Sequence, residues 1–205
     1  LVSIDMVAGP SEILIVADET VNPKYAAADL LSQAEHDKLA SAVLVTTSVK
    51  VAEEVQKELE VQIPLLERAE IARASIDNNG KIIVADDIRA AIDIANEIAP
   101  EHLELCVDNP FDYLDEIRHA GSVFMGKNCP EALGDYLAGA NHTLPTSGTA
   151  KFSSPLSVDD FVKKSQFTYY TREALACVAD QVAYFAKQEG LDAHARSATV
   201  RFEET

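Results

Sequence analysis

The chain of 205 residues is long enough to bury one or two hydrophobic cores. Hydrophobic residues make up 47% of it and charged residues 25%, the composition of an ordinary globular protein. The formal net charge of -17 argues against binding to nucleic acid or to an anionic membrane, because both need a basic face. No apolar run approaches the roughly 20 residues of a membrane-spanning helix. Cys106, Cys129 and Cys177 show no paired spacing, which favours reduced thiols in a cytoplasmic protein over a disulfide framework.

The first third of the sequence predicts alternating strands and helices. A strand-like run over residues 1–5 is unlike a natural start, so we expect a fragment or a processed chain in which residues 1–11 end a preceding domain. Residues 12–18 are an apolar run ended by charge, which predicts a buried strand. Pro23 suits the first turn of a helix that continues to Ala34. Residues 42–46 predict a second strand, and residues 49–66 a helix that breaks at Ile63-Pro64.

The alternation continues through the middle of the chain. A turn at residues 78–80 leads into a strand over 81–84, and Asp86 or Asp87 can cap a helix over 88–98. Residues 103–107 and 122–125 predict two more strands. This pattern predicts an α/β fold, a mainly parallel Rossmann-like sheet with flanking helices. We expect its core to contain Ile13, Leu14, Ile15, Val16, Val43, Leu44, Val45, Ile82, Ile83, Val84, Leu103, Leu105, Val123 and Phe124.

The composition changes near Ser157, which predicts an α/β domain over residues 1–155 and a small helical appendage over residues 156–205. Thr171 can cap a long helix over 173–188. A second helical stretch follows Gly190 and carries His194.

Residues 134–149 form the most informative segment. It contains Asp135 and His142, followed by turn-forming residues and small hydroxyls that could pack little core. A compact domain rarely keeps so long a polar segment unless it lines a site. An ordinary surface loop is the alternative.

Further residues suited to chemistry lie elsewhere. On a helix, Gln33 and His36 would share one face and could offer a metal an amide oxygen and an imidazole, although polar helix ends are usually just solvated. Glu101-His102 follows Pro100 at a helix-to-strand corner, and an adjacent carboxylate and imidazole suit general acid–base work. A plain surface corner is the commoner explanation. Glu189 and His194 bracket Gly190 in the tail, where such residues are often idle, and we expect the cysteines to be small buried hydrophobic residues.

Together these segments resemble one family, histidinol dehydrogenase, along the whole chain and in order. The strings that carry the resemblance are IDMVAGPSE (residues 4–12), QAEHD (33–37), APEHLEL (99–105), GDY (134–136), NHTLPT (141–146) and LDAH (191–194). They correspond to the C-terminal half of the family's polypeptide. The resemblance implies a zinc- and NAD-dependent four-electron oxidation of L-histidinol to L-histidine through an aldehyde held in the site.

The resemblance also implies roles for individual residues. Glu101 and His102 would be the acid–base pair, with His102 taking the hydroxyl proton and Glu101 activating a water molecule. The implied zinc ligands are Gln33, His36, Asp135 and His194, and the implied substrate contacts are these four together with Ser11, His102 and Glu189. His142 would lie in the substrate loop or orient a ligand, without ligating zinc itself.

The family's tail reaches into the neighbouring subunit's site, so the resemblance implies a homodimer with shared sites. Its main NAD contacts lie in the N-terminal half, and no Gly-rich dinucleotide fingerprint occurs here, so no residue is assigned to NAD and we expect little turnover from this half alone. Two alternatives stay open. One is a zinc hydrolase with the same ligands and Glu101 activating water. The other is a non-catalytic fragment whose tail mediates association.

Overall fold

The computed structural model describes residues 4, 6 and 8–203, and they fall into two compact units, unit 1 up to Val162 and unit 2 from Lys163. The strand-like run expected over residues 1–5 falls outside the described residues except for Ile4, and residues 9–11 carry no regular structure. No helix over the described ranges is long and apolar enough to cross a membrane. Cys106, Cys129 and Cys177 are all free.

Unit 1 is built on a five-stranded sheet in which every neighbouring pair of strands is parallel. The strand order is β3-β2-β1-β4-β5, which confirms the expected α/β class and its parallel sheet. The direction of winding reverses between β1 and β4, where Ile13 lies opposite His102. The strands are β1 (Glu12–Ala17), β2 (Ser41–Thr46), β3 (Lys81–Val84), β4 (His102–Cys106) and β5 (Ser122–Met125).

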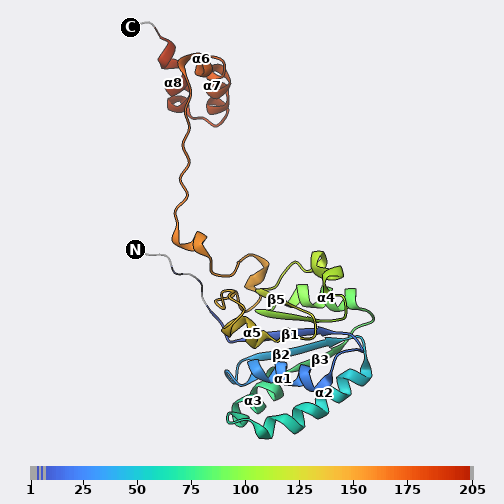
Figure 1. Cartoon of the computed structure of the whole chain (residues 1–205). Coiled ribbons are helices and arrows are strands. Elements are labelled where there is room, and N and C mark those ends of the chain that lie inside the picture. Colours follow the sequence, from blue (N-terminus) through green and yellow to red (C-terminus); the bar gives the residue numbers. More distant parts are fainter. Residues whose placement is uncertain (1–3, 5, 7, 204–205) are drawn as a thin grey trace. The chain divides into compact units, whose positions relative to one another are not determined.

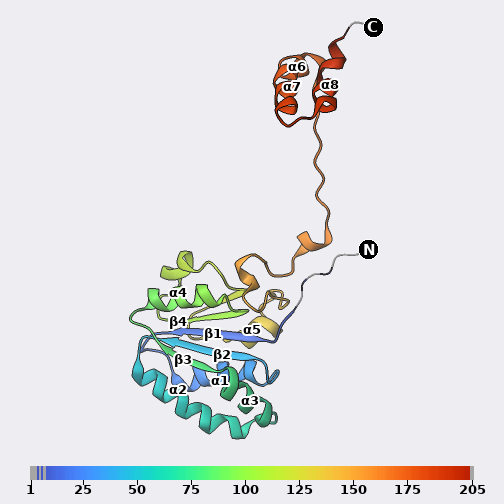
Figure 2. The same cartoon turned by 180° about the vertical axis from the view of Figure 1, so that it is seen from behind.

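Helices cover both faces of the sheet (Figure 1 and Figure 2). Helices α1 (Pro23–Ala34), α2 (Val49–Gln62) and α3 (Ala69–Asn79) lie on one face, and α4 (Ile88–Ile98) lies on the other. The short helix α5 (Glu131–Tyr136) follows β5. The 3₁₀ turns are η1 (Ile63–Leu65), η2 (Pro110–Glu116), η3 (Thr149–Lys151) and η4 (Val158–Phe161).

Local chemistry accounts for the helix starts. The Asn22 side chain accepts a hydrogen bond from the Lys24 N–H, and Pro23 occupies the first turn of α1. Asp87 caps α4 by accepting from the Ala90 N–H, so of the two expected candidates it is the cap. The helix expected over 49–66 ends at Gln62 because Ile63-Pro64 starts a 3₁₀ turn there, as predicted.

The core forms one cluster under α1–α3 and another under α4. Most of the expected core residues are buried, but Ile82 is 36% exposed and Val84 48%. These two predictions were wrong because β3 is an edge strand, with no further strand beside it among the described residues. Ile83 and Val123 are half-buried.

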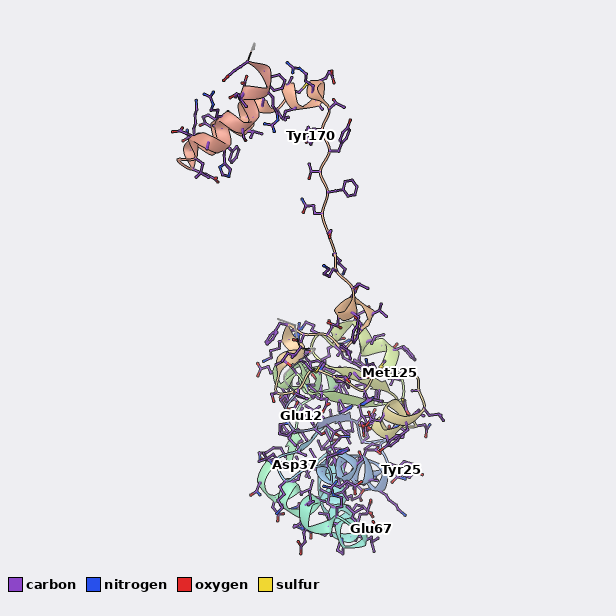
Figure 3. All side chains as sticks on the ribbon, turned by 90° about the vertical axis from the view of Figure 1, so that its left-hand side faces the viewer. Glu12, Tyr25, Asp37, Glu67, Met125 and Tyr170 are labelled. Carbon is purple, nitrogen blue, oxygen red and sulfur yellow. The ribbon has the colours of Figure 1, made fainter. Side chains whose placement is uncertain are left out.

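Unit 2 consists of α6 (Arg172–Ala176), α7 (Ala179–Gln188), α8 (Asp192–Thr199) and the turn η5 (Val200–Phe202). The Thr171 side chain caps α6 by accepting from the Ala174 N–H, as expected. The single helix expected over 173–188 is interrupted at residues 177–178, and α7 starts after the break. An extended segment precedes α6, and Figure 3 shows Tyr170 on it with its side chain pointing away from the backbone.

Candidate functional site at the amino ends of β1 and β4

The pair Glu101–His102 and the candidate ligands Gln33, His36 and Asp135 lie near the amino ends of β1 and β4, the end of the sheet that faces the viewer in Figure 3. Glu12 begins β1, and Glu101 directly precedes β4. Open parallel sheets more often bind ligands at the opposite, carboxyl ends where the winding reverses. A cavity of about 380 Å³ lies at those ends, lined in part by Asn22, Cys106 and Lys127, but none of the candidate site residues lines it.

Glu12 and Glu101 are joined across the two strands. The Glu12 N–H donates to Glu101 Oε2 at 3.0 Å, and the Glu101 N–H donates to Glu12 Oε2 at 3.3 Å. Burial raises the pKa of Glu101 to about 7, the Glu12 N–H opposes the shift, and the charges of Glu12, Asp135 and Glu131 add to it. A carboxyl group that titrates near neutrality is suited to both giving and taking a proton.

His102 is 3% exposed, and its ring is held by a residue of the neighbouring strand β1. Its Nδ1 donates to the Glu12 carbonyl at 2.9 Å, which leaves Nε2 as the unprotonated nitrogen of the neutral ring. Burial lowers the pKa of His102 and so favours the neutral form. Its Nε2 has no hydrogen-bond partner among the described residues and lies 3.7 Å from Glu131 Oε1. The free nitrogen is therefore available to accept a proton or to bind a metal.

Three buried polar atoms at this end lack a hydrogen-bond partner within the part of the chain that the structure describes. They are Gln33 Nε2, His102 Nε2 and Glu131 Oε1. Burial raises the pKa of Glu131, the charge of Asp135 raises it further, and the Gln33 amide opposes the shift. Unpartnered polar atoms are rare in folded proteins, so their grouping indicates a place for a ligand or an ion.

The structure suggests its own metal set. Ligand atoms of His102, Glu131 and Asp135 lie within 4.8 Å of one another. This set shares only Asp135 with the four ligands that the resemblance implies. The two sets lie close together, since Gln33 is near enough to Glu131 to lower its pKa and the charge of His36 lowers the pKa of His102.

Gln33 and His36 lie at the end of α1, but not on one helical face as expected. The helix ends at Ala34, and Glu35 is its cap, so His36 lies in the turn beyond. The prediction was wrong on this point because the helix stops before His36. The His36 N–H still donates to the Gln33 carbonyl at 3.1 Å, which folds the turn back toward Gln33. Gln33 is buried and His36 is exposed.

Asp135 lies on α5 and the segment after it runs back to β1. The segment expected to be a loop from residue 134 thus starts as the last turn of a helix. Thr146 Oγ1 accepts from the Gly9 N–H at 2.6 Å, and the Ser147 N–H donates to Glu12 Oε1 at 3.0 Å. A Cβ on Gly9 would lie 2.4 Å from Ser147 Oγ, so a larger residue here would require the Ser147 side chain to move. The segment therefore holds the Glu12 carboxylate in place through the Ser147 N–H.

The remaining candidates have simpler surroundings. Ser11 directly precedes Glu12, and its carbonyl accepts from the Ser41 N–H at 3.0 Å. His142 is exposed. In unit 2, Glu189 is the C-cap of α7 and His194 lies on α8. Both line a shallow, largely apolar hollow of about 420 Å³ together with Val182.

Sequence reasoning missed Glu12, Glu131 and Glu104 as members of the site. Each is a carboxylate within or beside an apolar stretch, and Glu131 and Glu104 are almost fully buried. A charged residue inside an otherwise apolar strand, as in LEL at 103–105, is the signal that could have found Glu104.

Comparison with known proteins identifies the family. The family model for histidinol dehydrogenase matches residues 1–202. Histidinol dehydrogenase from Bacillus cereus is 59% identical over 204 residues, covering 100% of this chain and 48% of that protein. The protein of the same name from Listeria monocytogenes serovar 1/2a is 58% identical over 204 residues, with 100% and 48% covered.

A solved structure is also similar. The crystal structure of histidinol dehydrogenase from Elizabethkingia anophelis matches with a TM-score of 0.92 and 42% identity, over 98% of this chain and 46% of that one. The chain spans about half the length of the curated relatives it matches. On these matches, the chain belongs to the histidinol dehydrogenase family.

Proposed function

We propose that this chain provides the zinc- and substrate-binding half of an enzyme that oxidises L-histidinol to L-histidine through histidinaldehyde. The observation that carries the proposal is the pair Glu101–His102, in which a carboxyl group with a pKa of about 7 adjoins a buried imidazole with a free Nε2. The oxidation of an alcohol to an acid needs a base for the hydroxyl proton and a base for the attacking water, and this pair offers both.

The residues present suit zinc. The donor set Gln33, His36, Asp135 and His194 offers two imidazoles and a carboxylate, which are accepted zinc ligands, together with an amide oxygen. When bound, zinc would supply a fixed anchor for the substrate imidazole and amine, and NAD would accept the hydrides. The unpartnered Gln33 Nε2 and His102 Nε2, neither of which is a ligand atom of this set, support a place for a polar ligand beside it. No residue of this chain is assigned to NAD.

The two protein bases act on different atoms. His102 Nε2 accepts the proton of the substrate hydroxyl, while the bond from Nδ1 to the Glu12 carbonyl fixes the ring and its tautomer. Glu101 takes a proton from the water molecule that attacks the aldehyde carbon. Its pKa of about 7 lets it hold this proton and then release it near neutral pH.

Zinc titrations of variants test the ligand set. We expect His36→Ala and Asp135→Ala to weaken zinc binding by about 100-fold, whereas His102→Ala changes it by less than about threefold. Competition with a chromophoric chelator measures these affinities. Asp37→Asn, beside His36 and outside the donor set, is the matched control. A loss in His102→Ala as large as that in His36→Ala would favour the set His102, Glu131 and Asp135 instead.

We further propose that the tail of one copy completes the site of another, so that Glu189 and His194 act in a homodimer. Mixing His36→Ala chains with His194→Ala chains should restore about one intact zinc site per mixed dimer, because one of its two sites would then carry both substitutions and the other neither. Neither variant alone should contain an intact site. If mixing restores no tight site although the two variants form mixed dimers, the shared-site proposal is wrong.

A further inference from the structure

Glu104 is a carboxyl group buried in the middle of the sheet. It is 1% exposed and lies in register between Ile15 of β1 and Phe124 of β5. Alternate residues of a strand point to the same face, so Glu104 shares a face with His102 and Cys106, and Cys106 belongs to the core cluster under α1. A carboxyl group in such a position is costly unless its oxygens have hydrogen-bond partners.

Both oxygens of Glu104 have partners: Oε2 accepts from the Cys106 thiol of the same strand at 3.8 Å, and further partners come from α5 and α1. Oε1 accepts from the Glu131 N–H at 2.8 Å. The residue before it, Pro130, provides no side-chain cap for α5, so the Glu104 carboxyl takes the place of that cap. The carboxyl groups of Glu104 and Asp29 share a hydrogen bond, which requires one proton between them. Glu104 thus connects β4 to α1 and to α5.

Each partner of Glu104 lies one helical turn before a proposed zinc ligand. Asp29 precedes Gln33 by four residues on α1, and Glu131 precedes Asp135 by four residues on α5, so each pair lies on one side of its helix. Ser32 of α1 also contacts α5, because its Oγ lies 3.1 Å from Glu131 Oε2, within hydrogen-bond distance.

We infer that Glu104 is a positioning residue that holds α5 against α1 and thereby sets the spacing of Gln33 and Asp135. The effect on zinc binding rests on the proposed function, whereas the contacts of Glu104 with α1 and α5 do not depend on it. Neither oxygen of Glu104 faces the substrate in this role. A hydrophobic residue of similar size would leave the buried Glu131 N–H without a partner and would remove the hydrogen bond to the half-buried Asp29 carboxyl.

Two substitutions separate the hydrogen bonds from the shape. Glu104→Gln keeps an acceptor for the Glu131 N–H and a donor for Asp29, whereas Glu104→Leu keeps the volume and loses both. Val45→Ala, a cavity in the fully buried centre of β2, is the control for general destabilisation, since it touches none of these contacts. Zinc affinity and amide hydrogen exchange of residues 131–137 are measured on the full chain and on each variant, after circular dichroism has established that each is folded.

We expect Glu104→Leu to weaken zinc binding at least tenfold and to raise exchange over residues 131–137 at least tenfold. Glu104→Gln should stay within about threefold of the parent chain in both, and Val45→Ala should leave both local readouts near the parent values. If Glu104→Leu does not fold, Asp29→Leu breaks only the α1 contact and should show the same loss of zinc affinity.

Three results would overturn the inference. The first is a folded Glu104→Leu variant, or Asp29→Leu in its place, that keeps the zinc affinity and hydrogen exchange of the parent chain. The second is a Glu104→Gln variant that loses as much zinc affinity and protection from exchange as Glu104→Leu. The third is a Val45→Ala variant with these same losses. A parent chain that binds no zinc through His36 would contradict the proposed function instead. The exchange of residues 131–137 would then still decide whether Glu104 holds α5.

Discussion

Glu12 and Glu101 exchange hydrogen bonds between β1 and the residue before β4, each backbone N–H donating to the other's carboxylate, at 3.0 Å and 3.3 Å. The Glu12 carbonyl also accepts from His102 Nδ1 at 2.9 Å. Glu12 therefore touches both proposed catalytic residues, one through its carboxylate and the other through its carbonyl. The pairing of β1 with β4 thus places Glu12 against both members of the proposed acid–base pair.

Removing the charge of Glu12 should lower the pKa of Glu101. In Glu12→Gln the single amide oxygen can accept from only one of the Glu101 and Ser147 N–H groups, which bond to different oxygens of Glu12, and the negative charge that raises the pKa of Glu101 is lost. We expect the pKa to fall below about 7 yet to stay above the ordinary 4.5, because burial is the largest cause of the shift. Carboxyl ¹³C NMR titration measures it. Glu19→Gln, at an exposed position, should leave the pKa unchanged, and an unchanged value in Glu12→Gln would refute the argument.

The stability of the metal-free chain should fall as the pH rises, and Glu104 should cause much of the fall. Its pKa is raised to about 9 in the folded state from 4.5, chiefly by burial, so its contribution to stability is complete below pH 4.5 and lost as the pH rises through about 9. Between pH 7.5 and 8.5 the free energy of unfolding should drop by up to about 1.4 kcal/mol per pH unit for this one proton.

Glu104→Gln should flatten that slope. Asp29 and Glu101, with pKa values of about 6 and about 7, have lost most of their effect by pH 7.5, and the difference between the parent and variant slopes then reports Glu104. Urea unfolding with a chelator present, at several pH values, gives the two slopes. Parallel slopes for parent and variant would show that Glu104 does not retain its proton.

Asn96 fastens the connection between β4 and β5 to α4. Its Nδ2 donates to the Glu116 carbonyl at 2.9 Å, and its Oδ1 accepts from the Arg118 and His119 N–H groups at 2.7 Å and 3.1 Å. Asn96→Ala should lower the free energy of unfolding by about 3 kcal/mol, because part-buried backbone groups lose their partners. Urea unfolding measures this. Asn79→Ala removes an exposed bond to the Lys38 carbonyl and should cost less than about 0.5 kcal/mol. Equal losses in the two variants would contradict the prediction.

Gly134 lets α5 lie close to β5. A Cβ at this position would lie 2.6 Å and 2.8 Å from two ring atoms of Phe124, whose ring neighbours that of His102 with centroids 5.9 Å apart. Gly134→Ala should therefore destabilise the chain by about 1–3 kcal/mol and weaken zinc binding about tenfold. Thermal unfolding and chelator competition test both effects. Leu133→Ala, on the exposed side of the same helix, should leave zinc binding nearly unchanged.

The sequence predicted the sheet well because its strands are short apolar runs between charged or turn residues. It did not predict α3, which starts at Ala69 without a side-chain cap, or α5, which is six residues long and contains Gly134. The exposure of Ile82 and Val84 depends on which strand ends up at the edge, and strand order is a property of the whole sheet.

The site was predictable only where a motif marked it. The pairs Gln33–His36 and Glu101–His102 lie in recognisable strings, and the structure places both at the same end of the sheet. Glu12 and Glu131 lie far from them in sequence and join them only through strand pairing and through the packing of α5. Their roles depend on spatial neighbours, which a periodicity of apolar residues does not reveal.

The most direct test of the central claim is a calorimetric titration of the zinc-loaded chain with L-histidinol, alongside its His36→Ala variant. We predict binding that requires zinc and disappears in the variant, because His36 is a proposed ligand of the zinc that anchors the substrate. A folded, zinc-loaded chain that binds no L-histidinol, or a variant that binds it as well as the parent, would contradict the assignment of the substrate site to these residues.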